Sequence, residues 1–205
     1  MDTSCTKPGL RERKKQQTRE NITRSALRLF AERGYDETTL ADIAEAADVS
    51  PRTIFSYYES KEDILFCQEG AFLQQLSERL EQRPAETTTV DAIREFIASL
   101  PPPDEEAMLR KQIVTSNPML QMKIRAHLGQ LEPLLTESIA KDLDASPDDI
   151  RPALLAASMT AAFTTVRDRL HEAGAGGALS HEDAMGTIDQ VLEFMRGGLE
   201  ALQRD

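Results

Sequence analysis

The hydrophobic positions of the chain recur at intervals of three and four residues, which is the spacing of one face of an α-helix. Between residues 17 and 33, Ile22, Ala26 and Leu29 share such a face, and Gly34 follows as a helix terminator. No stretch shows the strict alternation of apolar and polar positions that marks a half-buried strand. The pattern therefore predicts an all-α protein.

Two short helices joined by a tight turn are predicted within residues 39–63. Thr39 begins a capping box with Asp42, which starts the first of them. Ser50 is the predicted N-cap of the second, and Pro51 is its first residue, where the missing N–H costs nothing. The outward positions of the second helix are mostly polar. This arrangement is typical of a helix-turn-helix.

The same spacing predicts further helices along the rest of the chain. They cover residues 60–83, 91–100, 104–116, 118–143, 153–173 and 182–203. Pro84 and the prolines at 101–103 end two of them, and Pro133 predicts a kink in another. The glycines between 174 and 177 form a connection rather than a phosphate loop, because no strand precedes them and no lysine follows.

Charge divides the chain in the same way. Residues 1–33 carry nine Lys or Arg against four acidic residues, a net charge of +5, although the whole chain has a net charge of −11. An acidic protein repels DNA at long range, so any DNA binding must be confined to one face and depend steeply on salt. We expect a basic flexible arm at 1–15, a helix-turn-helix domain at 16–60 and a larger helical domain at 61–205. The alternative is that the arm is only a solvated tail.

Taken together, these motifs resemble the TetR family of transcriptional regulators over about residues 15–66. The matching segments are Leu-Phe-Ala-Glu-Arg-Gly-Tyr at 29–35, Thr-Thr-Leu-Ala-Asp-Ile-Ala at 38–44, Val-Ser-Pro-Arg-Thr-Ile-Phe-Ser-Tyr-Tyr at 49–58 and Ser-Lys-Glu-Asp-Ile-Leu at 60–65. The resemblance implies an N-terminal three-helix DNA-binding domain and a C-terminal helical domain for ligand binding and dimerisation. One departure is Asp48, where the family usually has glycine. Aspartate tolerates the left-handed conformation, so we expect a small strain and no change of fold.

The resemblance and the helix positions assign DNA-binding roles. Arg52 can reach a guanine edge or a phosphate, and Phe55 can touch a thymine methyl. Phe55 and Tyr58 have an alternative role in holding the small domain together. Thr39 and Lys61 lie at helix starts that face the DNA backbone in the family. The candidate DNA-binding residues are Thr39, Arg52, Thr53, Phe55, Ser56, Tyr57, Tyr58 and Lys61, with Lys14 and Lys15 from the basic arm.

The last predicted helix carries apolar residues at coiled-coil spacing, which indicates that it needs a partner helix. In TetR-like regulators the last two long helices pair between subunits, so the resemblance favours a homodimer on a palindromic operator. Its recognition helices would lie one DNA turn, roughly 34 Å, apart. The alternative is an intramolecular core. The candidate interface residues are Leu155, Met159, Val166, Ile188, Leu192, Met195 and Leu199.

Residues 109–118 and 131–135 resemble, more weakly, regulators that sense acyl-CoA-like or other lipidic ligands. Methionine and aromatic side chains adapt to irregular apolar ligands, and arginine suits an anionic head group. The candidate ligand-binding residues are Phe96, Met108, Arg110, Ile113, Met122, Arg125, Met159, Phe163 and Arg167. The alternatives are ordinary core positions for the apolar residues and surface charges for the arginines.

Other classes of protein lack support in the sequence. No apolar run approaches the roughly 18 residues that span a bilayer, and no secretion signal begins the chain, so we expect a cytoplasmic protein. Cys5 and Cys67 form neither a disulfide framework nor a zinc site, and the histidines are far apart, so we expect neither an enzyme nor a cofactor. The sequence favours a repressor released from its operator by a small hydrophobic or acyl-CoA-like effector. The alternative is a DNA-binding adaptor whose large domain binds a protein partner.

Overall fold

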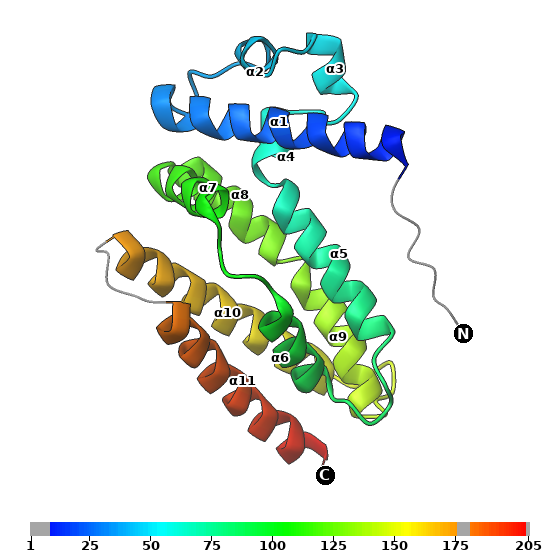
Figure 1. Ribbon diagram of the computed structural model, residues 1–205. Coiled ribbons are helices and arrows are strands. Elements are labelled where there is room, and N and C mark those ends of the chain that lie inside the picture. Colours follow the sequence, from blue (N-terminus) through cyan, green and yellow to red (C-terminus); the bar gives the residue numbers. More distant parts are fainter. Residues whose placement is uncertain (1–8, 176–180, 204–205) are drawn as a thin grey trace. The chain divides into compact units, whose positions relative to one another are not determined.

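The computed structural model describes residues 9–175 and 181–203, and these residues contain α-helices and no β-strand (Figure 1). The all-α prediction is therefore confirmed for the described part of the chain. The helices are α1 (Leu10–Arg33), α2 (Leu40–Ala46), α3 (Pro51–Phe55), α4 (Lys61–Leu65), α5 (Cys67–Glu81), α6 (Thr89–Ser99), α7 (Glu105–Ser116), α8 (Pro118–Leu128), α9 (Leu131–Asp142), α10 (Arg151–Ala175) and α11 (His181–Gln203). None of the described helices is both long and apolar enough to cross a membrane.

The chain forms two compact units. Among the described residues, unit 1 contains residues 9–67 and 103–117, and unit 2 contains residues 68–102, 118–175 and 181–203. The sequence predicts a boundary after residue 60, whereas unit 1 continues to residue 67, because Ile64 and Leu65 of α4 are fully buried and α4 packs on α1. The return of α7 to unit 1 was also not predicted. Its Glu106 forms an ion pair with Arg24 of α1 at 3.1 Å.

The helix-turn-helix forms as the capping residues predict. Thr39 and Asp42 make a reciprocal capping box, and the Ser50 hydroxyl accepts a hydrogen bond from the Thr53 N–H at 3.1 Å. Asp48 has φ of 54°, so it adopts the left-handed conformation expected where the family usually has glycine. The Asn21 side chain donates to the carbonyl of Ala47 at 2.8 Å and so holds the turn against α1.

The first helix begins earlier than predicted. It starts at Leu10 rather than residue 17, so the expected flexible arm is helical from residue 10 to residue 15. The physical reason is that this segment reads Leu-Arg-Glu-Arg-Lys-Lys, all residues of high helix propensity, and contains neither Gly nor Pro. The part of the predicted arm at residues 1–8 lies outside the described residues. Lys14 and Lys15 are therefore presented by a helix.

Two predicted long helices are each divided. The helix predicted at 60–83 breaks at Phe66, because Ile64, Leu65 and Phe66 are all buried and three consecutive side chains cannot share one helix face. The helix predicted at 118–143 breaks between α8 and α9, at residues 129–130. The kink expected near Pro133 was wrong, since Pro133 is the third residue of α9, where a backbone N–H has no partner within the helix.

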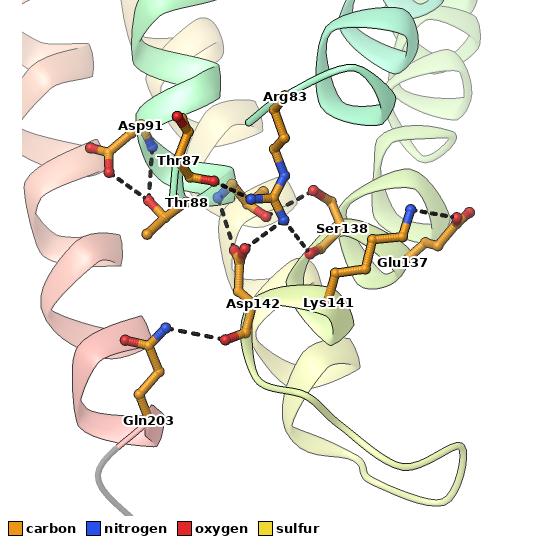
Figure 2. A network of polar contacts seen from close by, with 10 residues as sticks. Arg83, Thr87, Thr88, Asp91, Glu137, Ser138, Lys141, Asp142 and Gln203 are labelled. Carbon is orange, nitrogen blue, oxygen red and sulfur yellow. Dashed lines mark hydrogen bonds and ion pairs between the residues drawn. The ribbon is translucent and has the colours of Figure 1, made fainter. Parts of the chain in front are cut away.

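A polar network is buried in unit 2, where the end of α5, the start of α6 and α9 meet (Figure 2). The side chains of Arg83 and Asp142 form an ion pair and are only 8% and 4% exposed. Arg83 also donates to the carbonyls of Ser138 and Thr87. The second carboxylate oxygen of Asp142 accepts the Thr89 N–H at 2.8 Å. Each buried charge is thus paired and also hydrogen-bonded, which offsets its loss of hydration.

Candidate DNA-binding surface

The outward face of α3 consists of side chains that unit 1 does not need for its own packing. Ile54 is fully buried and anchors the helix, whereas Arg52 and Ser56 are exposed. Phe55 is 59% exposed, so the alternative role in which it holds the domain together does not fit the structure. An exposed aromatic ring beside an arginine and hydroxyl groups is a surface suited to base edges and thymine methyls.

Tyr58, unlike Phe55, is buried. It is only 4% exposed, and its hydroxyl lies 2.9 Å from the Thr23 hydroxyl and accepts the Arg19 Nε–H at 3.2 Å. The hydrogen bond from Arg19 to Tyr58 is also the main reason that the pKa of Arg19 lies above its ordinary value. Tyr58 therefore fastens the end of α3 to α1, which supports its alternative role in holding the small domain together.

Thr39 and Lys61, the two helix-start candidates, differ in their exposure and in their hydrogen-bond partners. Thr39 is exposed, and its hydroxyl and N–H both bond to Asp42, which together lower the pKa of that carboxyl group. The ammonium group of Lys61 instead donates to the backbone carbonyls of Tyr35, Asp36 and Thr38. The structure therefore directs Lys61 inward, to unit 1 itself.

A polar groove runs between the first half of α1 and the end of α3. Its lining residues are Glu12, Arg13, Lys15, Gln16, Gln17, Arg19, Glu20, Ser56 and Tyr57. The groove brings Lys15 next to two of the recognition-helix candidates, and Lys14 lies exposed on the same helix. Arg13 and Gln17 also line this groove, although they were not predicted as part of the DNA-binding surface. The sequence feature that could have predicted their position is the high helix propensity of residues 10–16, which extends α1 far enough to flank α3.

The ligand-binding candidates do not come together as one site. Phe96, Met159 and Phe163 pack in the hydrophobic core of unit 2. Met108 and Met122 are 62% and 61% exposed, so neither lines an internal cavity. The remaining candidates are also dispersed: Arg110 and Ile113 belong to unit 1, Arg125 is exposed on α8, and Arg167 is half-buried on α10.

The predicted dimer seam is part of the chain's own core. Leu155, Met159, Leu192, Met195 and Leu199 are all buried in one cluster within unit 2. The two other candidates behave similarly, since Val166 is 9% exposed and Ile188 packs on the cluster. The burial of these residues within one chain supports the alternative of an intramolecular core. The coiled-coil spacing of α11 is satisfied by α10 and α6 of the same chain.

Comparison with known proteins settles the family. The profile of bacterial regulatory proteins of the tetR family matches residues 22–66, and the profile of the MftR C-terminal domain matches residues 84–200. The chain is also 33% identical over 164 residues to the HTH-type transcriptional regulator TcmR of Streptomyces glaucescens, covering 73% of this chain and 71% of TcmR. This chain belongs to the TetR family. It is a DNA-binding transcriptional regulator.

Solved structures show the same fold. SmeT of Stenotrophomonas maltophilia, in complex with triclosan, has a TM-score of 0.60 at 21% identity and covers 87% of this chain and 91% of its own. FadR of Thermus thermophilus, a TetR-family repressor in complex with lauroyl-CoA, has a TM-score of 0.55 at 24% identity and covers 88% of this chain and 94% of its own. At these identities the likeness concerns the TetR fold, with its helix-turn-helix and its larger helical domain.

Proposed function

We propose that this TetR-family regulator binds a palindromic operator as a homodimer and represses transcription from it. The observation that carries the proposal is the outward face of α3, where Arg52, Phe55 and Ser56 are exposed on a helix fixed from behind by Ile54. A short, firmly held helix whose outward side chains do not pack against the rest of the chain is suited to binding in the major groove. Repression is the activity that the FadR and SmeT descriptions give for those proteins.

The roles on the surface follow from chemistry and exposure. Arg52 is the candidate for a bidentate contact to guanine, and Phe55 is the candidate for a thymine methyl. Thr53, Ser56 and Tyr57 supply hydroxyl groups near bases and phosphates. Thr39, at the start of α2, and the cations Lys14 and Lys15 of α1 are assigned to the DNA backbone, which fixes the position of α3 without reading sequence.

The outer face of α10 and α11 is the proposed dimer interface in place of the seam. Leu154 and Phe194 are 58% and 75% exposed, which single-chain packing does not explain. Small residues at helical spacing flank them: Ser158, Ala161 and Thr165 on α10, and Gly197 and Ala201 on α11. A β-carbon at Gly197 would meet no atom of the described chain, so there is room for a neighbouring helix. Two such faces would form a four-helix interface.

The proposal extends to release from DNA by a small hydrophobic or acyl-CoA-like effector. Met159 and Met195 in the core of unit 2 provide side chains that adapt to such a ligand. The alternative is that unit 2 binds a protein partner. Because ligand and operator must oppose each other reciprocally, an effector raises the melting temperature of the free protein and weakens operator binding. Acyl-CoAs and related apolar compounds that change neither quantity would favour the protein partner.

The role of α3 is tested by Arg52→Ala. We expect operator binding to weaken by about 1 to 3 kcal/mol, because a base contact is lost, while the free energy of unfolding stays within about 0.5 kcal/mol. Fluorescence anisotropy and chemical denaturation measure the two quantities. Arg79→Ala is the control, since Arg79 is an exposed arginine of α5 that pairs with Glu95. Equal operator affinity for wild type and Arg52→Ala would remove α3 from the site.

The cations of α1 are tested without shortening the helix. We expect Lys14→Gln/Lys15→Gln to weaken binding to operator and to random DNA by similar factors, because phosphate contacts carry no sequence information. The slope of log affinity against log salt should become shallower by roughly two. Salt titrations of both duplexes measure this change. A variant with the wild-type slope on both duplexes would show that these lysines are only solvated.

A further inference from the structure

The turn between α1 and α2 is held from several sides. Gly34 ends α1 with φ of 94°, a conformation that glycine adopts without strain. Thr38 is buried, and its hydroxyl donates to the carbonyl of Gly34 at 2.8 Å. The amide of Asn117 donates to the carboxylate of Asp36 at 3.1 Å. The residue that follows this turn is Thr39, the N-cap of α2.

Lys61 makes the most extensive of these connections. It is the first residue of α4, and its Nζ lies 2.7 Å, 3.3 Å and 3.2 Å from the carbonyl oxygens of Tyr35, Asp36 and Thr38. The same nitrogen lies 4.3 Å from the centre of the Tyr35 ring. Burial raises the pKa of the Tyr35 hydroxyl, so that ring remains neutral. Three carbonyl dipoles and an aromatic face therefore surround one ammonium group.

We propose that Lys61 is a positioning residue for DNA recognition, which holds the α1–α2 turn and with it the start of α2, and that it is not a phosphate contact. This proposal rests on the proposed function. A lysine ammonium has three N–H donors, and three carbonyl oxygens accept them here. Turning the group toward a phosphate would leave these carbonyls without their donor. The reach of Lys61 thus links α4 to the turn that starts α2, and α2 in turn packs on α3.

The two roles predict different salt dependence. Loss of a phosphate contact makes the slope of log affinity against log salt shallower by about one. Loss of a positioning group changes no counterion release, but it misplaces α3 and so weakens base contacts more than phosphate contacts. The ratio of operator affinity to random-DNA affinity should then fall at an unchanged slope. A residue that contributes only to the stability of the fold should change neither the salt slope nor the affinity ratio when binding is measured under conditions in which the protein is folded.

The experiment compares Lys61→Met with Lys14→Met in the full chain, at a temperature well below melting. For Lys61→Met we expect the ratio of operator affinity to random-DNA affinity to fall roughly tenfold, the size of effect expected when one hydrogen bond from a charged group is lost. The salt slope should stay at its wild-type value on both duplexes. In the free protein, hydrogen exchange at the amides of residues 36–39 should be faster than in wild type. For Lys14→Met we expect the reverse: a shallower slope, an unchanged ratio and unchanged exchange in the turn.

Lys61→Arg covers the case in which Lys61→Met does not fold. It keeps the charge, but its planar guanidinium cannot direct donors to all three carbonyls, so positioning predicts a reduced affinity ratio at the wild-type slope. A slope shallower by one in Lys61→Met, or a wild-type ratio in either variant, would overturn the proposal. Operator binding by the wild-type protein tests the proposed function separately, so failure here changes only the role of Lys61.

Discussion

Asp142→Ala is expected to lower the free energy of unfolding by about 3 to 5 kcal/mol, because it leaves the buried guanidinium of Arg83 without its counter-charge. Asp142 also accepts the Thr89 N–H at 2.8 Å, so the substitution removes a hydrogen bond at the start of α6 as well. The matched control is Glu95→Ala, which breaks the exposed ion pair with Arg79 and should cost less than about 1 kcal/mol. Urea denaturation of both variants gives the two values.

A double variant separates the charge from the packing. We expect Arg83→Met/Asp142→Leu to be within about 2 kcal/mol of wild type or more stable, because apolar side chains of similar volume avoid the cost of burying charge. If Asp142→Ala costs no more than Glu95→Ala, the network of Figure 2 does not hold α5, α6 and α9 together in solution. If the double variant is as unstable as Asp142→Ala, the hydrogen bonds to Thr89 and Ser138 contribute more to stability than the ion pair between Arg83 and Asp142.

The second large effect concerns Phe194. Phe194→Glu is expected to convert the proposed homodimer to a monomer, because a carboxylate without a partner would be buried in the proposed interface. Operator affinity should then fall by about 100-fold or more, since the two half-sites are no longer bound by linked recognition helices. The free energy of unfolding of the isolated chain should change little, because Phe194 is 75% exposed.

Sedimentation measures the assembly state, and anisotropy measures the affinity. Met122→Glu is the control, because Met122 is also an exposed apolar residue, at 61%, but lies on α8 rather than on the proposed interface. It should remain a dimer. A dimeric Phe194→Glu variant with wild-type operator affinity would place the interface elsewhere.

The parts of the structure that depend on local chemistry could be predicted from the sequence. The capping box of Thr39, the N-cap Ser50 and the left-handed Asp48 are properties of a few adjacent residues, so the sequence positions α2 and α3 correctly. The exposure of Arg52 and Ser56 follows from the same helix register. These residues are the part of the candidate site that local patterns determine.

Features that depend on partners distant in the sequence could not be predicted in this way. The apolar spacing around Leu192 shows that α11 needs a partner helix, but the same spacing serves an intramolecular partner and a second subunit equally well. Tyr58 and Lys61 are polar residues at positions typical of DNA contacts, and only their long-range hydrogen bonds to Arg19 and Tyr35 show that they face inward. The return of α7 to unit 1 likewise leaves no local signal.

Sequence-specific DNA binding by this chain is tested by selection from a randomised duplex library. We predict enrichment of a palindrome whose half-sites are about one helical turn apart, bound by two copies of the chain. Binding to the enriched duplex should be at least roughly 1,000-fold tighter than to random duplex of the same length, and it should weaken steeply with salt. No enrichment, or equal affinity for enriched and random duplexes, would contradict sequence-specific regulation through α3.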